Sequence, residues 1–74
     1  MKELYPNIAV DPAVQFGKPV IAGTRVPVAV IIGHIAAGTT INEVMREYKL
    51  TKEQVLAALK YASKIVAEET VMAQ

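Results

Sequence analysis

Two helix-capping boxes close together in the second half of the chain constrain its fold more than any other feature. Thr40 with Glu43, and Thr51 with Gln54, match the pattern in which a threonine and a side chain three residues later satisfy the first amides of a helix. Two helices with fixed starts are therefore predicted within residues 41–60. Their apolar residues recur at helical spacing: Ile41, Val44, Met45 and Tyr48 in the first, and Val55, Ala58, Leu59, Ala62 and Val66 in the second.

The corner between these helices is Lys49-Leu50-Thr51, where Leu50 is the one apolar residue that can fill the angle. Two helices joined this closely form a helix-turn-helix unit, whose second helix can enter a DNA major groove. We expect that second helix to begin near Lys52 and to run to about Ala67, with Val71 as its outer limit. The sequence leaves the conformation of residues 68–74 open.

A third helix is predicted ahead of this pair, over residues 28–37. Pro27 suits the first turn of a helix, where its missing N–H costs nothing, and Gly38 is a good residue to end one. This helix is apolar on almost every side, which is typical of a helix buried on more than one face. We interpret it as the central helix of the core and as a candidate dimer contact.

The N-terminal part is predicted to be extended and irregular, because prolines and glycines interrupt it repeatedly. Residues 1–4 are expected to form a loose terminus. Residues 8–10 and 20–21 read as short strands, and residues 12–15 as one helical turn. The chain is thus expected to be a single domain over 1–74, with an extended or β-turn part over 1–27 and three helices over 28–70.

Composition limits the classes of protein that this chain can belong to. It has 74 residues, no cysteine, 53% hydrophobic residues and only 5% aromatic residues, so its core must be aliphatic. So much aliphatic content in a short chain predicts apolar surface for a partner, either a homodimer or a dedicated second protein. The net charge of +1 is not that of a polybasic nucleic-acid binder. The longest apolar run, residues 26–32, is too short to span a bilayer, so a cytoplasmic protein with no membrane association is the default expectation.

No set of residues predicts an enzyme, a metal site or a cofactor. His34 lies in the apolar helix without a second ligand type nearby, so we expect a packing or hydrogen-bonding role. Gly17 and Gly23 lack the spacing of a phosphate loop and are expected to supply unusual φ angles in tight turns. Arg25 could pair with a carboxylate or a helix C-terminus, which we favour, or it could reach a phosphate.

The outward face of the predicted helix pair is the candidate DNA contact. Lysines there could contact phosphates, and Leu56 and Ala57 could meet a thymine methyl group, but no Asn or Arg stands where a bidentate base contact is expected. From the residues alone, two interpretations of this face are about equally supported: a DNA-binding surface, or the solvated face of a plain three-helix domain. The predicted DNA-binding residues are Arg46, Lys49, Thr51, Lys52, Glu53, Leu56, Ala57 and Lys60.

A longer motif lies just before the helices, in the run FGKPVIAGTRVPV. Its fixed positions are Gly17, Pro19, Ile21, Gly23, Thr24, Arg25 and Pro27. With this motif, the segment over residues 8–62 resembles a prokaryotic family catalogued as domain of unknown function 433. Members of that family look like antitoxins of type II toxin–antitoxin pairs, and they are often paired with a small PIN-like ribonuclease toxin.

The resemblance implies a mainly α fold, a homeodomain-like three-helix bundle with a helix-turn-helix, preceded by a short extended or β segment. It also implies two linked jobs, which are neutralising the toxin by direct contact and repressing the protein's own operon by binding DNA. Two positions depart from the usual helix-turn-helix pattern: Met45 replaces a small residue, and Lys49 replaces the corner glycine. The alternative function is a dimeric protein-interaction module that does not bind DNA.

Overall fold

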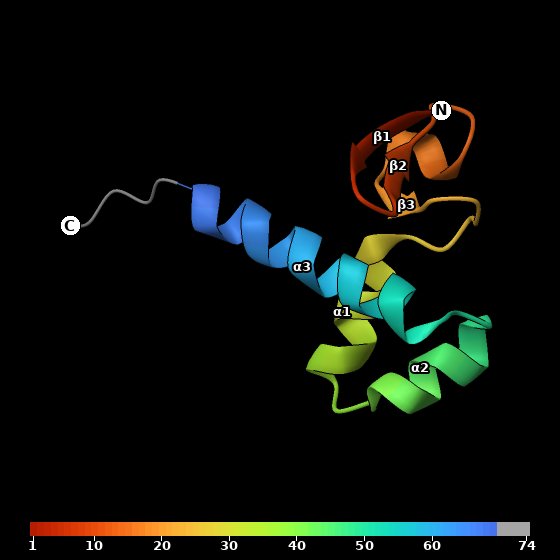
Figure 1. The fold of residues 1–74 in the computed structure, drawn as a ribbon, viewed down its shortest axis with the longest axis vertical. Helices are drawn as coiled ribbons and strands as arrows, with labels where there is room; N and C mark the ends of the chain where they lie inside the picture. The colour runs from red at the N-terminus through yellow and green to blue at the C-terminus, as the bar shows by residue number, and fades with distance from the viewer. Residues whose placement is uncertain (70–74) are drawn as a thin grey trace.

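The computed structural model describes residues 1–69, in which a small sheet precedes three helices (Figure 1). The sheet and α2 lie at opposite ends of the body, and α1 and the first half of α3 lie between them. The elements in chain order are β1 (Lys2–Tyr5), β2 (Ile8–Val10), the 3-10 turn η1 (Gln15–Gly17), β3 (Val20–Ile21), α1 (Val28–Ala36), α2 (Ile41–Tyr48) and α3 (Lys52–Glu68).

The N-terminal residues form an edge strand, so the expectation of a loose terminus over 1–4 is wrong. The sheet is antiparallel, with the order β1-β2-β3. Pro6 and Asn7 connect β1 to β2, and Asn7 adopts a positive φ of 68° that asparagine tolerates better than most residues. Leu4 is the extra residue of a bulge in β1, since the register shifts between Glu3 and Tyr5. The turn expected at residues 12–15 lies slightly later, as η1.

The expected mainly α, homeodomain-like three-helix bundle is also wrong, because the sheet is part of the core. Ile8 of β2 and Ile21 of β3 are completely buried and belong to the same apolar cluster as Ile31, Val44 and Val55 of the helices. α3 packs against both of these strands as well as against α1 and α2. The protein is therefore a small α+β fold in which an antiparallel sheet packs against α3 and shares its core with the helices.

The predicted helices are confirmed, as are both capping boxes. The Thr40 hydroxyl accepts from the Glu43 amide at 3.1 Å, and the Thr51 hydroxyl accepts from the Gln54 amide at 3.1 Å. α1 ends just before Gly38, which has a φ of 96°. α3 continues to Glu68, and the predicted limits at residue 70 and at Val71 lie outside the described residues.

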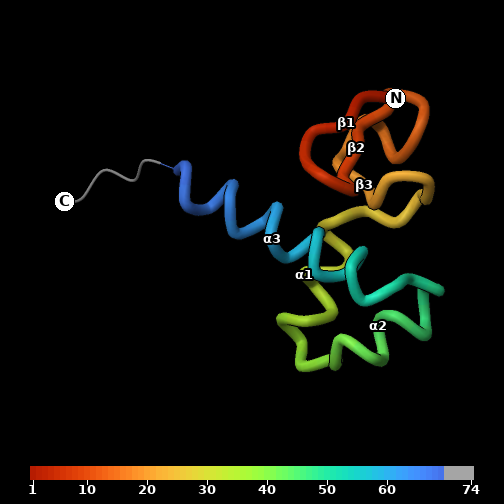
Figure 2. Tube along the Cα trace, in the orientation of Figure 1, coloured from red at the N-terminus to blue at the C-terminus, as the bar shows by residue number. Residues whose placement is uncertain are grey.

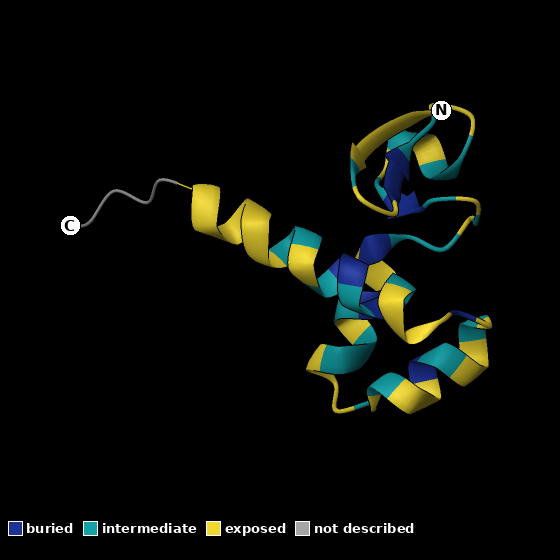
Figure 3. Ribbon diagram, in the orientation of Figure 1, coloured by how far each residue is buried: buried dark blue, intermediate teal, exposed yellow. Residues whose placement is uncertain are grey.

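The second half of α3 extends away from the rest of the body (Figure 2). Residues 63–69 are all exposed, whereas the first half of the helix contributes Val55 and Ala58 to the core (Figure 3). None of the helices within residues 1–69 has the length and apolar character that crossing a membrane requires.

The corner between α2 and α3 is closed by a residue in the left-handed region. Lys49 has φ 55° and ψ 47°, a conformation that is costly for a side chain with a Cβ. The Leu50 amide donates to the Met45 carbonyl at 2.9 Å, and the Leu50 side chain is buried. Lys49 thus makes the turn that glycine usually makes, and Leu50 fills the angle as predicted.

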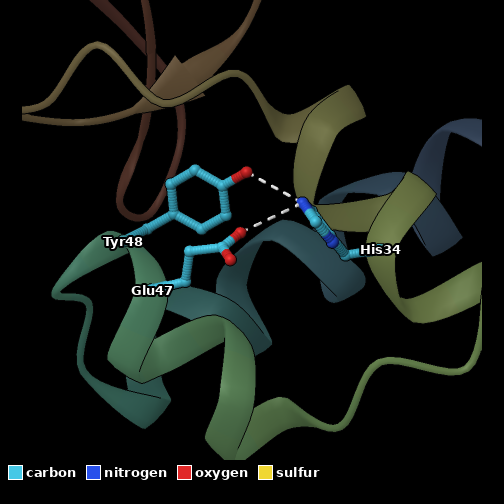
Figure 4. A network of polar contacts seen from close by, with 3 residues as sticks. All are labelled: His34, Glu47 and Tyr48. Atoms are coloured by element: carbon cyan, nitrogen blue, oxygen red, sulfur yellow. Dashed lines mark hydrogen bonds and ion pairs between the residues drawn. The ribbon is translucent and has the colours of Figure 1, made fainter.

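His34 joins α1 to the last turn of α2 (Figure 4). Its Nε2 shares a hydrogen bond of 2.8 Å with the Tyr48 hydroxyl, and the Glu47 carboxylate lies 3.5 Å from the same nitrogen. Burial, and then the negative charge of Glu47, raise the pKa of the Tyr48 hydroxyl. The expected hydrogen-bonding role of His34 is confirmed, and the contact sets where α2 lies relative to α1.

Replacing Lys49 with glycine should stabilise the protein, because glycine adopts a positive φ without strain. We expect the free energy of unfolding in urea to rise by roughly 0.5–1 kcal/mol. The matched control is Lys60→Gly, which places the same substitution on an exposed position in the middle of α3 and should lower stability by about 1 kcal/mol. Equal destabilisation by both variants would contradict the strain assigned to Lys49.

Replacing Tyr48 with phenylalanine should destabilise the protein, because it removes the hydroxyl that binds His34. The expected loss is about 0.5–1.5 kcal/mol, the usual net contribution of one hydrogen bond, measured from the urea midpoint. Tyr61→Phe is the control, since the Tyr61 hydroxyl makes no hydrogen bond with any residue in 1–69. An unchanged midpoint for Tyr48→Phe would show that the contact does not hold α2 in place.

Candidate functional site

The residues predicted to face DNA lie on α2, on the corner and on the first half of α3. Most of their side chains are exposed: Arg46, Lys49, Thr51, Lys52, Glu53 and Lys60. Leu56 is half-buried, and Ala57 belongs to the core with only 7% of its surface exposed. The Ala57 methyl group therefore packs inside the protein and does not offer the surface that was expected for a thymine contact.

The turn between β1 and β2 lies beside this face of α3, which sequence reasoning missed. Tyr5, Pro6 and Asn7 line a hollow of about 290 Å³ whose other wall is α3. The signal for the turn was present, since Pro-Asn suits the two central positions of a tight turn. Its position against α3 depends on tertiary packing. The α3 residues that line the hollow are Glu53, Leu56, Ala57 and Lys60.

Positive charge on this surface is concentrated at the corner and on α3. Lys49, Lys52 and Lys60 form no ion pair within the part of the chain that the structure describes. Arg46 differs, because the Glu43 carboxylate lies near it on α2. Hydrogen bonds from the Thr40 amide and hydroxyl, and to a lesser degree the charge of Arg46, hold the pKa of Glu43 below its ordinary value. Glu43 is therefore ionised at neutral pH and offsets the charge of Arg46.

The glycine- and proline-rich motif forms the connection from β3 to α1. Gly23 has a φ of 79°, as predicted for a tight turn, and the Thr24 amide donates to the Ile21 carbonyl across that turn at 3.0 Å. The Thr24 hydroxyl donates to the same carbonyl at 2.7 Å and accepts from the Val26 amide at 3.0 Å. The Thr24 side chain thereby forms hydrogen bonds with the backbone on both sides of the turn.

The same motif positions the start of α1 against the sheet. The Val28 amide, the first of α1, donates to the Pro19 carbonyl at 3.0 Å, and Pro27 forms a bridge with Val20. Arg25 is exposed, and its guanidinium forms no ion pair with residues 1–69. Its backbone carbonyl accepts from the Gln15 side chain at 3.2 Å. The favoured pairing of Arg25 with a carboxylate is thus not formed within the described chain.

Apolar surface remains exposed beside α1 and along the second half of α3. Val66 is 67% exposed and Ile65 is 40% exposed. They border an open groove of about 290 Å³ whose lining is mostly apolar, with Lys18 and Tyr61 as the two residues that carry polar groups on their side chains. The other residues that line it are Pro19, Pro27, Val28, Ala29 and Ala62.

Comparisons with known proteins match the part of the chain that contains these features. A curated relative, named "Putative antitoxin VapB45" and from Mycobacterium tuberculosis (strain ATCC 25618 / H37Rv), is 38% identical over 53 residues. The match covers 72% of this chain and 22% of the relative, so this chain spans less than a quarter of that protein's length.

A solved structure matches this chain with the same sequence identity and the same coverage of this chain. The X-ray crystal structure of Rv2018 from Mycobacterium tuberculosis matches with a TM-score of 0.65 and 38% sequence identity. The match covers 72% of this chain and 25% of that one. A family model described as "Protein of unknown function (DUF433)" matches residues 8–62, which include the sheet from β2 onward, the motif and most of the helices. Because that match covers well over half of the chain, the protein belongs to the DUF433 family.

Proposed function

We propose that this chain is the antitoxin of a type II toxin–antitoxin pair and acts by binding rather than by catalysis. The observation that carries the proposal is the 38% identity to a protein named as an antitoxin, over 72% of this chain. An antitoxin role requires a toxin partner, and the family resemblance points to a PIN-like ribonuclease. The relative is much longer than this chain, so the proposal concerns the part that the two proteins share.

The exposed apolar surface supports a protein partner. A chain that leaves Val66 and Ile65 exposed beside an apolar groove has surface suited to a protein interface. Whether a second copy of this chain also associates stays a prediction. The mass of the isolated protein in solution, measured by light scattering, tests that expected homodimer.

We propose further that α2 and α3 bind DNA, with α3 directed at the major groove. Lys49, Lys52 and Lys60 supply positive charge near the start of α3, and amides at a helix N-terminus favour a phosphate. Two observations favour the alternative of an interaction module that does not bind DNA. The net charge is only +1, and the Pro6–Asn7 turn stands beside the face that would enter the groove.

The antitoxin proposal predicts that co-expression with the product of the adjacent gene yields a complex that survives purification. If that product is toxic on its own, co-expression should restore growth, because the antitoxin blocks the toxin by direct contact. An unrelated toxin of similar size serves as the control and should be neither bound nor neutralised. Failure of the adjacent product to associate, with its toxicity unchanged, would refute the antitoxin role.

The DNA proposal predicts that exchanging Lys52 and Lys60 for glutamate abolishes retardation of the protein's own promoter fragment at low salt. The charge-matched control is the pair Lys2→Glu and Lys18→Glu, which lies outside the proposed face. Equal loss in both pairs would indicate a general charge effect, and no retardation by the unmodified protein would favour the alternative.

A further inference from the structure

The turn η1 carries the only exposed aromatic residue among residues 1–69. Phe16 is 95% exposed, although a phenylalanine is among the residues that gain most from burial. It follows Gln15 and precedes Gly17, and all three residues have positive φ, at 50°, 57° and 79°. Glycine adopts this left-handed backbone freely, but glutamine and phenylalanine do so only with strain.

Hydrogen bonds brace this strained turn from both sides. The Gly17 amide donates to the Val14 carbonyl at 3.0 Å, and the Lys18 amide donates to the Gln15 carbonyl at 3.1 Å. The Gln15 side chain donates to the Arg25 carbonyl at 3.2 Å, which ties η1 to the loop between β3 and α1. Phe16 is therefore displayed on a fixed support and not on a loose loop.

Nothing in the fold of residues 1–69 accounts for this combination of strain and exposure. Phe16 contributes no buried area to the core, and its backbone conformation costs stability. Strained residues held in place by their surroundings are common where a protein clamps a ligand or a partner. A large aromatic side chain on a rigid support is also the usual form of a binding hot spot.

The charges around the turn indicate the chemistry of the partner. Lys18 lies two residues after Phe16, and the Gln15 contact brings the backbone of Arg25 to the same turn. Both cationic side chains are exposed, and neither forms an ion pair with the described residues. A surface complementary to this arrangement has an apolar pocket for the ring and carboxylates at its rim.

We propose that Phe16 inserts into an apolar pocket with an acidic rim on the toxin, with Lys18 and Arg25 facing the rim. This assignment rests on the proposed antitoxin function and gives the family motif around Phe16 a role in partner binding. It favours a protein over DNA because only two cations flank the ring and because the turn belongs to neither α2 nor α3. The residue is a binding anchor that the fold itself does not require.

The test is Phe16→Gly, for which the proposal predicts opposite effects on stability and on binding. Glycine relieves the positive φ, so the isolated protein should unfold at a higher urea concentration. The complex with the co-expressed product of the adjacent gene should weaken by about thirty-fold or more, which corresponds to a hot-spot residue. A purely structural role would change both properties in the same direction. Leu4→Ala, which truncates another exposed apolar side chain, is the control and should leave the affinity unchanged.

The binding measurements distinguish the anchor proposal from the antitoxin proposal. If the unmodified protein binds the adjacent product and Phe16→Gly binds equally well, the anchor proposal is wrong and the antitoxin proposal stands. If the unmodified protein does not bind that product, the antitoxin proposal fails and the anchor on a toxin fails with it. If Phe16→Gly keeps its toxin affinity but loses retardation of promoter DNA, the ring contacts nucleic acid and the protein assignment is overturned.

Discussion

The structure depends on a small aliphatic core, and β2, β3, α1, α2 and α3 each contribute one of its five largest fully buried side chains. These residues are Ile8, Ile21, Ile31, Val44 and Val55. Full burial of one such side chain is worth about 1.5–3 kcal/mol, and a chain of this length has few of them to lose. Each element therefore needs the others to cover its own apolar residue. The sheet, although short, is as necessary to the core as any helix.

This constraint explains which parts of the fold the sequence predicted. The starts of α2 and α3 were predicted correctly because the capping boxes at Thr40 and Thr51 act within one helical turn. β1 was missed because Lys-Glu-Leu-Tyr has no alternating pattern and becomes a strand only by pairing with β2. The contact between His34 and Tyr48 joins two helices, so no local pattern could reveal it, although an apolar helix containing one histidine favoured a hydrogen-bonded role.

Local sequence patterns were also insufficient to predict the surroundings of the candidate DNA face. Helical periodicity predicted that Lys52, Lys60 and Ala57 share one outward surface of α3. It could not show that the β1–β2 turn lies beside that surface. The structure places Tyr5 and Asn7 across the hollow from that surface and buries Ala57. A duplex that approaches α3 would meet this turn as well as the helix. Any base contacts would therefore involve a composite surface and not a bare recognition helix, which is why charge and periodicity alone could not decide the question.

Backbone strain separates the positions that serve the fold from the one that does not. Among residues 1–69, positive φ angles occur at four non-glycine residues, which are Asn7, Gln15, Phe16 and Lys49. Asn7 completes the β1–β2 turn, and Lys49 closes the corner that lets Leu50 enter the core, so the fold accounts for both. Gln15 is tied to the Arg25 carbonyl, whereas Phe16 beside it is 95% exposed, so burial in the core does not offset its strain. Sequences tend to break local rules where function requires it, and in this chain the unexplained exception lies inside the family motif and away from the helix pair.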